Sequence, residues 1–189
     1  MKKCFIRTAA LFIAIIGFTC NPALAVVIDF EDLPHADELQ GAGNSYTSKG
    51  FTLTYAPAVN EPYPVGFTTV GPSWQYNRRS AAFTANSCSA TTILTSDNSK
   101  PFMLDSIDLA ALNGDKGIVV EFVGTTVEGT TVIETFHLVE RNVWKKYQLP
   151  REFRNLISVT WTQGDCIVMP PHMFDNIHVT PSVKNNNDN

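Results

Sequence analysis

The sequence predicts an all-β protein, an antiparallel β-sandwich of the jelly-roll type. Roughly nine short runs rich in β-branched and aromatic residues follow one another, and turn residues separate them. No segment has the 3.6-residue apolar spacing of a convincing amphipathic helix. No repeat of fixed length is present, which excludes solenoids and propellers. Many short strands without helices are typical of a sandwich or jelly roll.

Residues 1–25 have the organisation of a secretory signal peptide. A positively charged start (Met1 to Lys3, with Arg7) precedes an apolar run, and Ala23-Leu24-Ala25 forms a small-x-small cleavage site. The apolar run is too short for a transmembrane span, and no second one follows it. We therefore expect cleavage after Ala25, export to the periplasm or the outside, and no membrane span in the mature chain.

The expected mature chain of 164 residues is long enough for one domain with its own core. The leader carries three of the 14 basic residues and none of the 18 acidic ones, so cleavage changes the net charge from −4 to −7. An acidic, exported protein without a basic cluster does not suit nucleic-acid binding. We expect the β-sandwich to cover 26–182 and the polar residues 183–189 to form a disordered tail.

The first predicted strand, 26–30, leads directly into acidic residues that include Glu31 and Asp32. Near the other end, the segment 173–179 again places apolar residues around one acid, Asp175. We expect these segments to be the first and last strands of the sandwich. Carboxylates at strand ends suit a hard cation such as Ca²⁺, which takes six to eight oxygen ligands. The alternative is that these acids are solvated residues at strand ends.

The strands expected between these two are justified by β-branched runs, alternation and flanking turns. They cover 51–55, 80–85, 91–95, 102–110, 118–123, 131–139 and 156–161. Within 102–110, alternation predicts that Phe102 and Leu104 lie opposite Ile107 and Leu109. The glycine-containing segment 35–45 is expected to be a loop.

A long irregular excursion is expected after the second of these strands, because 57–72 contains four prolines and two glycines. It brings Tyr63 close in sequence to Trp74, Tyr76 and Arg78. Sugar rings stack on aromatic side chains while arginine binds hydroxyls, so these four residues are the predicted ligand-binding set. The alternative is a loop that packs back on its own domain.

Two cysteines, Cys88 and Cys166, remain after the leader is removed. An even pair in an oxidising compartment predicts one disulfide. Closing this 78-residue separation stabilises the fold by roughly 4 kcal/mol in the chain-entropy model, less any strain. Neither cysteine belongs to a CxxC motif, which argues against zinc binding or redox chemistry.

A series of short motifs runs through most of the mature chain. They are Phe30-Glu31-Asp32-Leu33-Pro34, Tyr46 with Gly50-Phe51, Ala81-Ala82-Phe83, Pro101 to Ala110, Val120 to Gly124, and Phe174-Asp175-Asn176-Ile177. This order resembles exported bacterial proteins with a jelly-roll, galactose-binding or carbohydrate-binding-module-like domain, many of them of the PEP-CTERM type. This sequence departs from them by having Phe174 where methionine or leucine is usual and by showing no PEP-CTERM tail.

The resemblance implies a structural calcium ion that bridges the first and last strands. It assigns Glu31 and Asp175 as ligands, with Asp32 as a further one. It also implies a carbohydrate or a cell-surface component as partner.

Patterns of known catalytic sites are absent from the sequence, including G-x-S-x-G, HExxH, the P-loop and GxGxxG. The four histidines, His35, His137, His172 and His178, make no obvious metal-binding trio. Glu121 and Glu134 are placed to face each other across a predicted hairpin, which is the paired-carboxylate arrangement of glycosidases. The alternative is two cross-strand acids on a solvated face.

The expected function is that of a secreted, non-catalytic module that binds a glycan or the cell envelope and carries a structural calcium ion. One alternative is a jelly-roll polysaccharide lyase or hydrolase. Another is a structural subunit of a matrix or an adhesin.

Overall fold

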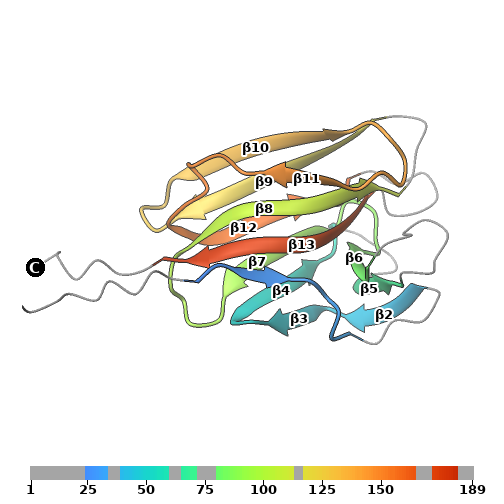
Figure 1. Cartoon of the computed structure of the whole chain (residues 1–189), viewed down its shortest axis with the longest axis horizontal. Coiled ribbons are helices and arrows are strands. Elements are labelled where there is room, and N and C mark those ends of the chain that lie inside the picture. Colours follow the sequence, from blue (N-terminus) through green and yellow to red (C-terminus); the bar gives the residue numbers. More distant parts are fainter. Residues whose placement is uncertain are drawn as a thin grey trace, which may run out of the picture.

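The computed structural model describes residues 24–33, 39–59, 65–71, 80–112, 117–164 and 172–182. In these residues the protein is all-β and contains no helix (Figure 1). The thirteen strands are β1 (Val26–Ile28), β2 (Leu39–Gly43), β3 (Ser45–Ser48), β4 (Phe51–Ala56), β5 (Phe67–Val70), β6 (Ala82–Ala85), β7 (Thr91–Ser96), β8 (Phe102–Ala111), β9 (Ile118–Thr126), β10 (Thr131–Leu138), β11 (Lys145–Gln148), β12 (Leu156–Thr162) and β13 (His172–Pro181).

The strands form one antiparallel sheet with three regions of continuous pairing. In the first region β13 lies between β1 and β8, and β8 also pairs with β11. The second follows the order β3-β4-β7-β12-β9-β10. The third consists of β2, β5 and β6. Single residue pairs join the first region to the others, Phe102 with Leu156 and Phe174 with Phe83.

The sheet bends until its two ends come together. Along the path of paired strands β2 and β3 stand at opposite ends, yet one residue, Asn44, separates them in the chain. The carbonyl of Asn44 accepts a hydrogen bond from the backbone N–H of Tyr55 in β4 at 2.9 Å. The sheet is therefore nearly closed and barrel-like, which leaves fewer exposed strand edges than an open sheet has.

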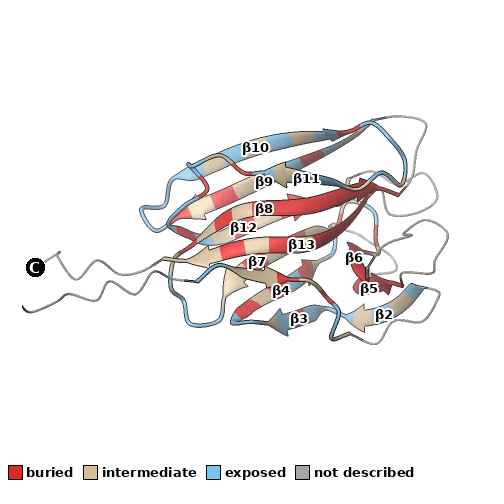
Figure 2. Cartoon of the chain, in the orientation of Figure 1, coloured by how far each residue is buried: buried red, intermediate tan, exposed pale blue. Residues whose placement is uncertain are grey.

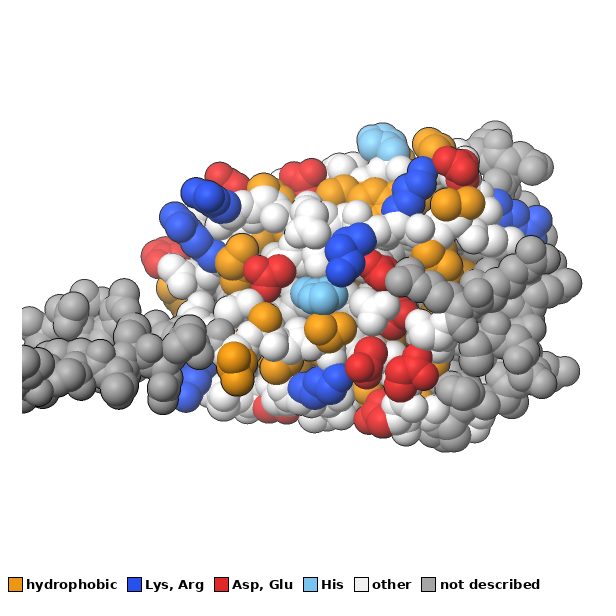
Figure 3. All heavy atoms as spheres, viewed as in Figure 1, with side chains coloured by type: hydrophobic (Ala, Val, Ile, Leu, Met, Phe, Trp, Pro, Cys, Tyr) orange, Lys and Arg blue, Asp and Glu red, His pale blue; other side chains and the backbone are white. Residues whose placement is uncertain are grey.

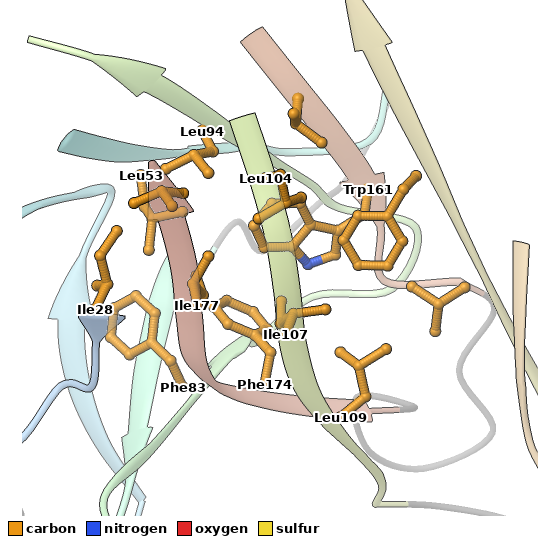
Figure 4. Close-up of a cluster of buried hydrophobic side chains, with 14 of the residues drawn as sticks. Ile28, Leu53, Phe83, Leu94, Leu104, Ile107, Leu109, Trp161, Phe174 and Ile177 are labelled. Atoms are coloured by element: carbon orange, nitrogen blue, oxygen red, sulfur yellow. The ribbon is translucent and has the colours of Figure 1, made fainter. Parts of the chain in front are cut away.

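The core is filled by side chains that alternate with exposed ones along most strands, as Figure 2 shows for β4, β7 and β9. A series of aromatic contacts crosses it from β5 to β9, with ring centroids 4.7 to 5.8 Å apart. The series is Phe67, Phe83, Phe174, Trp161 and Phe122. Figure 4 shows Phe83, Phe174 and Trp161 among the leucines and isoleucines of neighbouring strands. Such pairs stabilise the fold beyond the area they bury.

All of the predicted strand segments are found as strands, with shifted ends, but four further strands were not expected. The segments 39–43 and 45–48 form β2 and β3, although the first was predicted to be a loop. Residues 67–70 and 145–148 form β5 and β11. All four are short, and their hydrogen-bond partners are distant in sequence or follow a tight turn. Local sequence patterns give little signal for such short strands, because pairing with other strands in the tertiary structure determines whether they form.

The prediction that Phe102 and Leu104 lie on the opposite face of β8 from Ile107 and Leu109 is wrong. All four side chains belong to one core cluster. The register explains the change of face. Ser106 pairs with His178 while Leu104 pairs with Val179, so Asp105 is an additional residue on β8. An additional residue of this kind reverses the alternation of the side chains that follow it.

Candidate functional site

The segments expected to be the first and last strands of the domain are β1 and β13, and the structure pairs them with each other. Val26 to Ile28 of β1 pair antiparallel with Ile177 to Val179 of β13. Chain that continues beyond Ile28 therefore runs alongside residues 174–176, and the rings of Phe30 and Phe174 lie 5.8 Å apart. The acids that follow β1 and the acid inside β13 thus reach the same part of the molecule.

Asp175 is completely buried, and its carboxylate accepts hydrogen bonds from Ser80 and Asn176. The hydroxyl of Ser80 donates to Oδ2 at 2.6 Å, the backbone N–H of Asn176 donates to Oδ1 at 2.7 Å, and the Asn176 side-chain amide donates to Oδ2 at 3.1 Å. A buried carboxylate needs such donors to offset its lost hydration. Asp175 therefore fixes the position of Ser80.

Glu31 is exposed, and its Oε1 accepts a hydrogen bond from the backbone N–H of Ala81 at 3.0 Å. The two acids predicted to share a calcium ion are therefore bound to adjacent residues, Ser80 and Ala81. These residues precede β6 directly. One acid from each end of the domain thus fixes the chain where it enters β6.

Asp32 makes a different contact. Its Oδ1 accepts a hydrogen bond of 2.6 Å from the hydroxyl of Tyr46 in β3. Burial and this bond raise the pKa of Tyr46 well above its usual value, so the phenol stays protonated and remains a donor. The Tyr46 ring lies 5.2 Å from that of Phe30. Asp32 therefore joins the turn after β1 to the edge strand β3.

A further buried acid, Asp108 of β8, was missed by the sequence analysis. It is 2 % exposed, it pairs in register with Asp175, and its Oδ2 accepts a hydrogen bond from the Asn176 side chain at 3.2 Å. Asn176 has φ of 45° and lies where the β13 register shifts. Bulges of this kind often re-aim side chains next to functional sites. The signal available in the sequence was an acid inside an otherwise apolar strand.

The acidic side chains gather on one part of the surface. Figure 3 shows several of them close together on the face that carries β1 and β13. Lys49, at the turn after β3, forms an ion pair of 3.0 Å with Asp29 there. Within the described ranges no group of three acidic, histidine or cysteine side chains is arranged to hold a metal ion. Hydrogen-bond donors of the protein contact all three predicted calcium ligands, and the calcium ion remains a prediction.

The predicted ligand-binding residues Tyr63, Trp74, Tyr76 and Arg78 lie outside the described residues. The strands on either side of the segment 72–79 are described. β5 and β6 pair antiparallel, with Val70 opposite Ala82, so the segment connects two adjacent strand ends. It ends at Ser80 and Ala81, the residues that Asp175 and Glu31 hold.

Cys88 lies in the turn between β6 and β7, and Cys166 lies outside the described residues. The neighbouring backbone connects the two regions. Ser89 N–H donates to the carbonyl of Gly164 and Gln163 N–H donates to that of Ala90, both at 2.7 Å. The turn that carries Cys88 is thus fixed beside a residue two positions before Cys166. This supports the predicted disulfide, which stays a prediction.

The prediction that Glu121 and Glu134 face each other across the hairpin is wrong. Glu121 pairs with Thr135 and Glu134 pairs with Phe122, so the two acids lie on opposite faces of the β9–β10 hairpin. Side chains alternate along paired strands, and adjacent pairs therefore point in opposite directions. The arrangement that retaining or inverting glycosidases require is not formed by these two residues.

Comparison with known proteins identifies no relative. No family model matches the chain, and neither a curated protein nor a solved structure matches it. In the part of the chain that the structure describes, no helix is long and apolar enough to cross a membrane.

Proposed function

We propose that the chain is an exported, non-catalytic binding module that recognises a carbohydrate or another component of the cell surface. Recognition is assigned to the segment 72–79 with Trp74, Tyr76 and Arg78, and to Tyr63 before it. The proposal includes the finer architecture, in which the two larger regions of the sheet are the layers of a jelly-roll sandwich like those of carbohydrate-binding modules.

One observation carries this proposal. Glu31 and Asp175, from opposite ends of the domain, both hold the dipeptide Ser80-Ala81 at the end of the aromatic segment. Anchoring of a loop end by a buried carboxylate reduces the conformational entropy that ligand binding must remove. Binding residues often lie on loops that a rigid scaffold positions in this way.

A structural calcium ion belongs to the proposal, with Glu31, Asp32 and Asp175 as ligands. Its support is the convergence of acids from β1 and β13 on one part of the molecule. Carboxylate oxygens that accept a hydrogen bond have further lone pairs for coordination. The ion would then strengthen contacts that the protein groups already make.

The experiment is a binding screen of the mature, oxidised protein against immobilised glycans and isolated cell-envelope fractions. We expect Trp74→Ala and Tyr76→Ala to weaken binding strongly while the melting temperature stays close to that of the wild type. The matched control is Trp144→Ala, which removes a half-buried tryptophan before β11. Equal loss of binding in the control, or binding that survives both loop variants, would contradict the assignment to this segment.

The enzymatic alternative is tested in the same preparation. The assay measures the release of reducing ends or unsaturated products from a panel of polysaccharides. Release that is lost in Glu134→Gln would show that the protein is a lyase or hydrolase and not a non-catalytic binding module. Self-association into fibres without glycan binding would favour a matrix or adhesin subunit.

A further inference from the structure

The outer face of the second sheet region carries rows of hydroxyl side chains that cross six strands. The pairing registers align one residue of each strand with one residue of the next strand. The first row consists of Thr47, Thr52, Thr95, Ser158, Thr125 and Thr131. The second row consists of Ser45, Thr54, Ile93, Thr160, Val123 and Ile133. We call these two rows the hydroxyl face.

Every residue of the hydroxyl face is exposed or half-buried. The residues between them along the strands point inward, as Leu53, Leu94 and Val159 do with at most 1 % exposure. The first row presents a hydroxyl at every strand, and the second alternates hydroxyls with β-branched aliphatic side chains. Each threonine also contributes a methyl group. The surface thus repeats a hydrogen-bonding group and an apolar group from strand to strand.

Neither row of the hydroxyl face contains a charged residue, although at its edge the Asp97 carboxylate accepts a hydrogen bond of 2.5 Å from the Thr52 hydroxyl. The six strands contain no lysine or arginine, and their two acids are Glu121 and Glu134. Glu121 borders the face and Glu134 points the other way. The first sheet region differs, because it carries Asp105, Lys146 and His178, and Figure 3 shows acidic and basic side chains on its outer side. The two outer faces therefore differ in charge, because the strands of the hydroxyl face carry no lysine or arginine while the first sheet region carries charges of both signs.

We infer that the hydroxyl face binds a neutral polysaccharide chain that lies across the strands along the first row. This inference goes beyond the proposed function, because it assigns a second binding surface, apart from the segment 72–79, and names its ligand class. Sugar hydroxyls and serine or threonine hydroxyls are donors and acceptors for one another, and methyl groups contact the apolar C–H faces of the rings. An anionic polysaccharide finds no cation here and meets the negative charge of the whole chain, which is −4.

Sheet twist favours a flexible single chain as ligand over a flat crystalline surface. Adjacent strands rotate by roughly 20–25°, so the direction in which the row's side chains point twists by about 100° in total across six strands. The row is roughly 24 Å long at about 4.8 Å per strand. A polysaccharide follows such a path by rotation about its glycosidic bonds, whereas a rigid lattice contacts one part of it.

No aromatic residue belongs to the two rows, so each sugar contributes little and affinity increases with the number of sugars bound. The test is native gel electrophoresis of the full mature protein through gels that contain a soluble polysaccharide. Galactomannan, glucomannan, mixed-linkage glucan and dextran serve as neutral polymers, and alginate and polygalacturonate as anionic ones. We expect retardation by a neutral polymer that increases with chain length and persists at high salt.

Two variants of the first row test its role. Thr95→Lys and Ser158→Lys place a charge at its centre, and Met103→Lys places the same charge in β8 of the other sheet region as the control. The double substitution Thr95→Val with Thr125→Val keeps the β-branched shape and removes two hydroxyls. At about 1 kcal/mol for each of the two hydrogen bonds it should weaken binding about 30-fold, without loss of fold by circular dichroism.

The outcomes separate this inference from the proposed function. Retardation that is lost in Trp74→Ala and unchanged in the row variants overturns the inference and leaves the proposed module intact. Retardation by anionic polymers alone overturns it as well. A wild-type dimer that Thr95→Lys converts to a monomer would show that the face binds a second copy of the chain instead.

Discussion

At the scale of single residues, the buried carboxylate of Asp175 organises its surroundings. Its contacts with Ser80 and Asn176 join the last strand to the start of β6 and to the β13 bulge. A buried acceptor that loses its donor retains the cost of desolvation. The free energy of unfolding is therefore sensitive to the loss of these hydrogen-bond donors, which no pattern in the sequence marks.

Ser80→Ala removes the hydroxyl that donates to Asp175. We expect a loss of roughly 1–3 kcal/mol in the free energy of unfolding, measured by denaturant titration at neutral pH. Ser182→Ala is the control, since its hydroxyl makes one long contact of 3.5 Å with Asn155. The control should stay within about 0.5 kcal/mol of the wild type. Equal stabilities of the two variants would show that the Ser80 bond contributes nothing.

His172, completely buried at the start of β13, makes stability depend on pH. Burial lowers its pKa from 6.5 to about 4, because the charged ring is disfavoured. Between pH 6.5 and 4 the unfolded chain binds the proton more readily than the folded one. This contribution is complete above pH 6.5 and is lost as the pH falls to 4, by about 3 kcal/mol in total.

The measurement is the free energy of unfolding from pH 7 to 4 for the wild type, His172→Gln and the exposed control His137→Gln. The difference between wild type and His172→Gln should change by about 3 kcal/mol across this range. The control should follow the wild type. A constant difference between wild type and His172→Gln would mean that the histidine takes up its proton equally in both states.

At the scale of elements, close approach of strands restricts side-chain size. An added Cβ at Gly124 of β9 would lie 2.8 Å from Val132 Cγ2 and 2.9 Å from Leu156 Cδ2. The glycine thus allows the hairpin and β12 to pack closely. Gly41 of β2 has open space around the same position.

Gly124→Ala should therefore destabilise the protein by about 1–3 kcal/mol, as overpacking of a core does. Gly41→Ala is the matched control and should be neutral or slightly stabilising, because it reduces the entropy of the unfolded chain. Thermal unfolding of both variants gives the comparison. Similar melting temperatures would show that the neighbours of Gly124 move aside at no cost.

At the scale of the whole molecule, the first and last strands close the domain side by side. The proposed calcium ion acts at this scale, because it would bind β1 and β13 together. Mature protein should gain about 2.7 kcal/mol at a calcium concentration one hundred times the dissociation constant. A chelator should reverse the gain.

Thermal unfolding with calcium, with magnesium and with chelator makes this measurement. Glu31→Gln and Asp175→Asn should lose the response to calcium, while Glu128→Gln, in the hairpin between β9 and β10, should retain it. An identical melting temperature in all three solutions would remove calcium from the proposal. The hydrogen bonds that hold Ser80 and Ala81 would then act alone.

The sequence by itself determined the all-β class, the positions of the long strands and the identity of the first and last strands. These features follow from β-branched and aromatic runs such as Ile118 to Val123, which specify strands through local propensity and alternation. It also indicated Glu31 and Asp175 as residues that act together.

The tertiary structure alone decided four short strands, the change of face within β8, and the separation of Glu121 from Glu134. It also revealed Asp108 and the hydroxyl face. Each depends on which strand lies next to which and in what register, and a shift of one residue reverses the face of every side chain. Register is set by contacts between residues far apart in the chain, so no local pattern contains it.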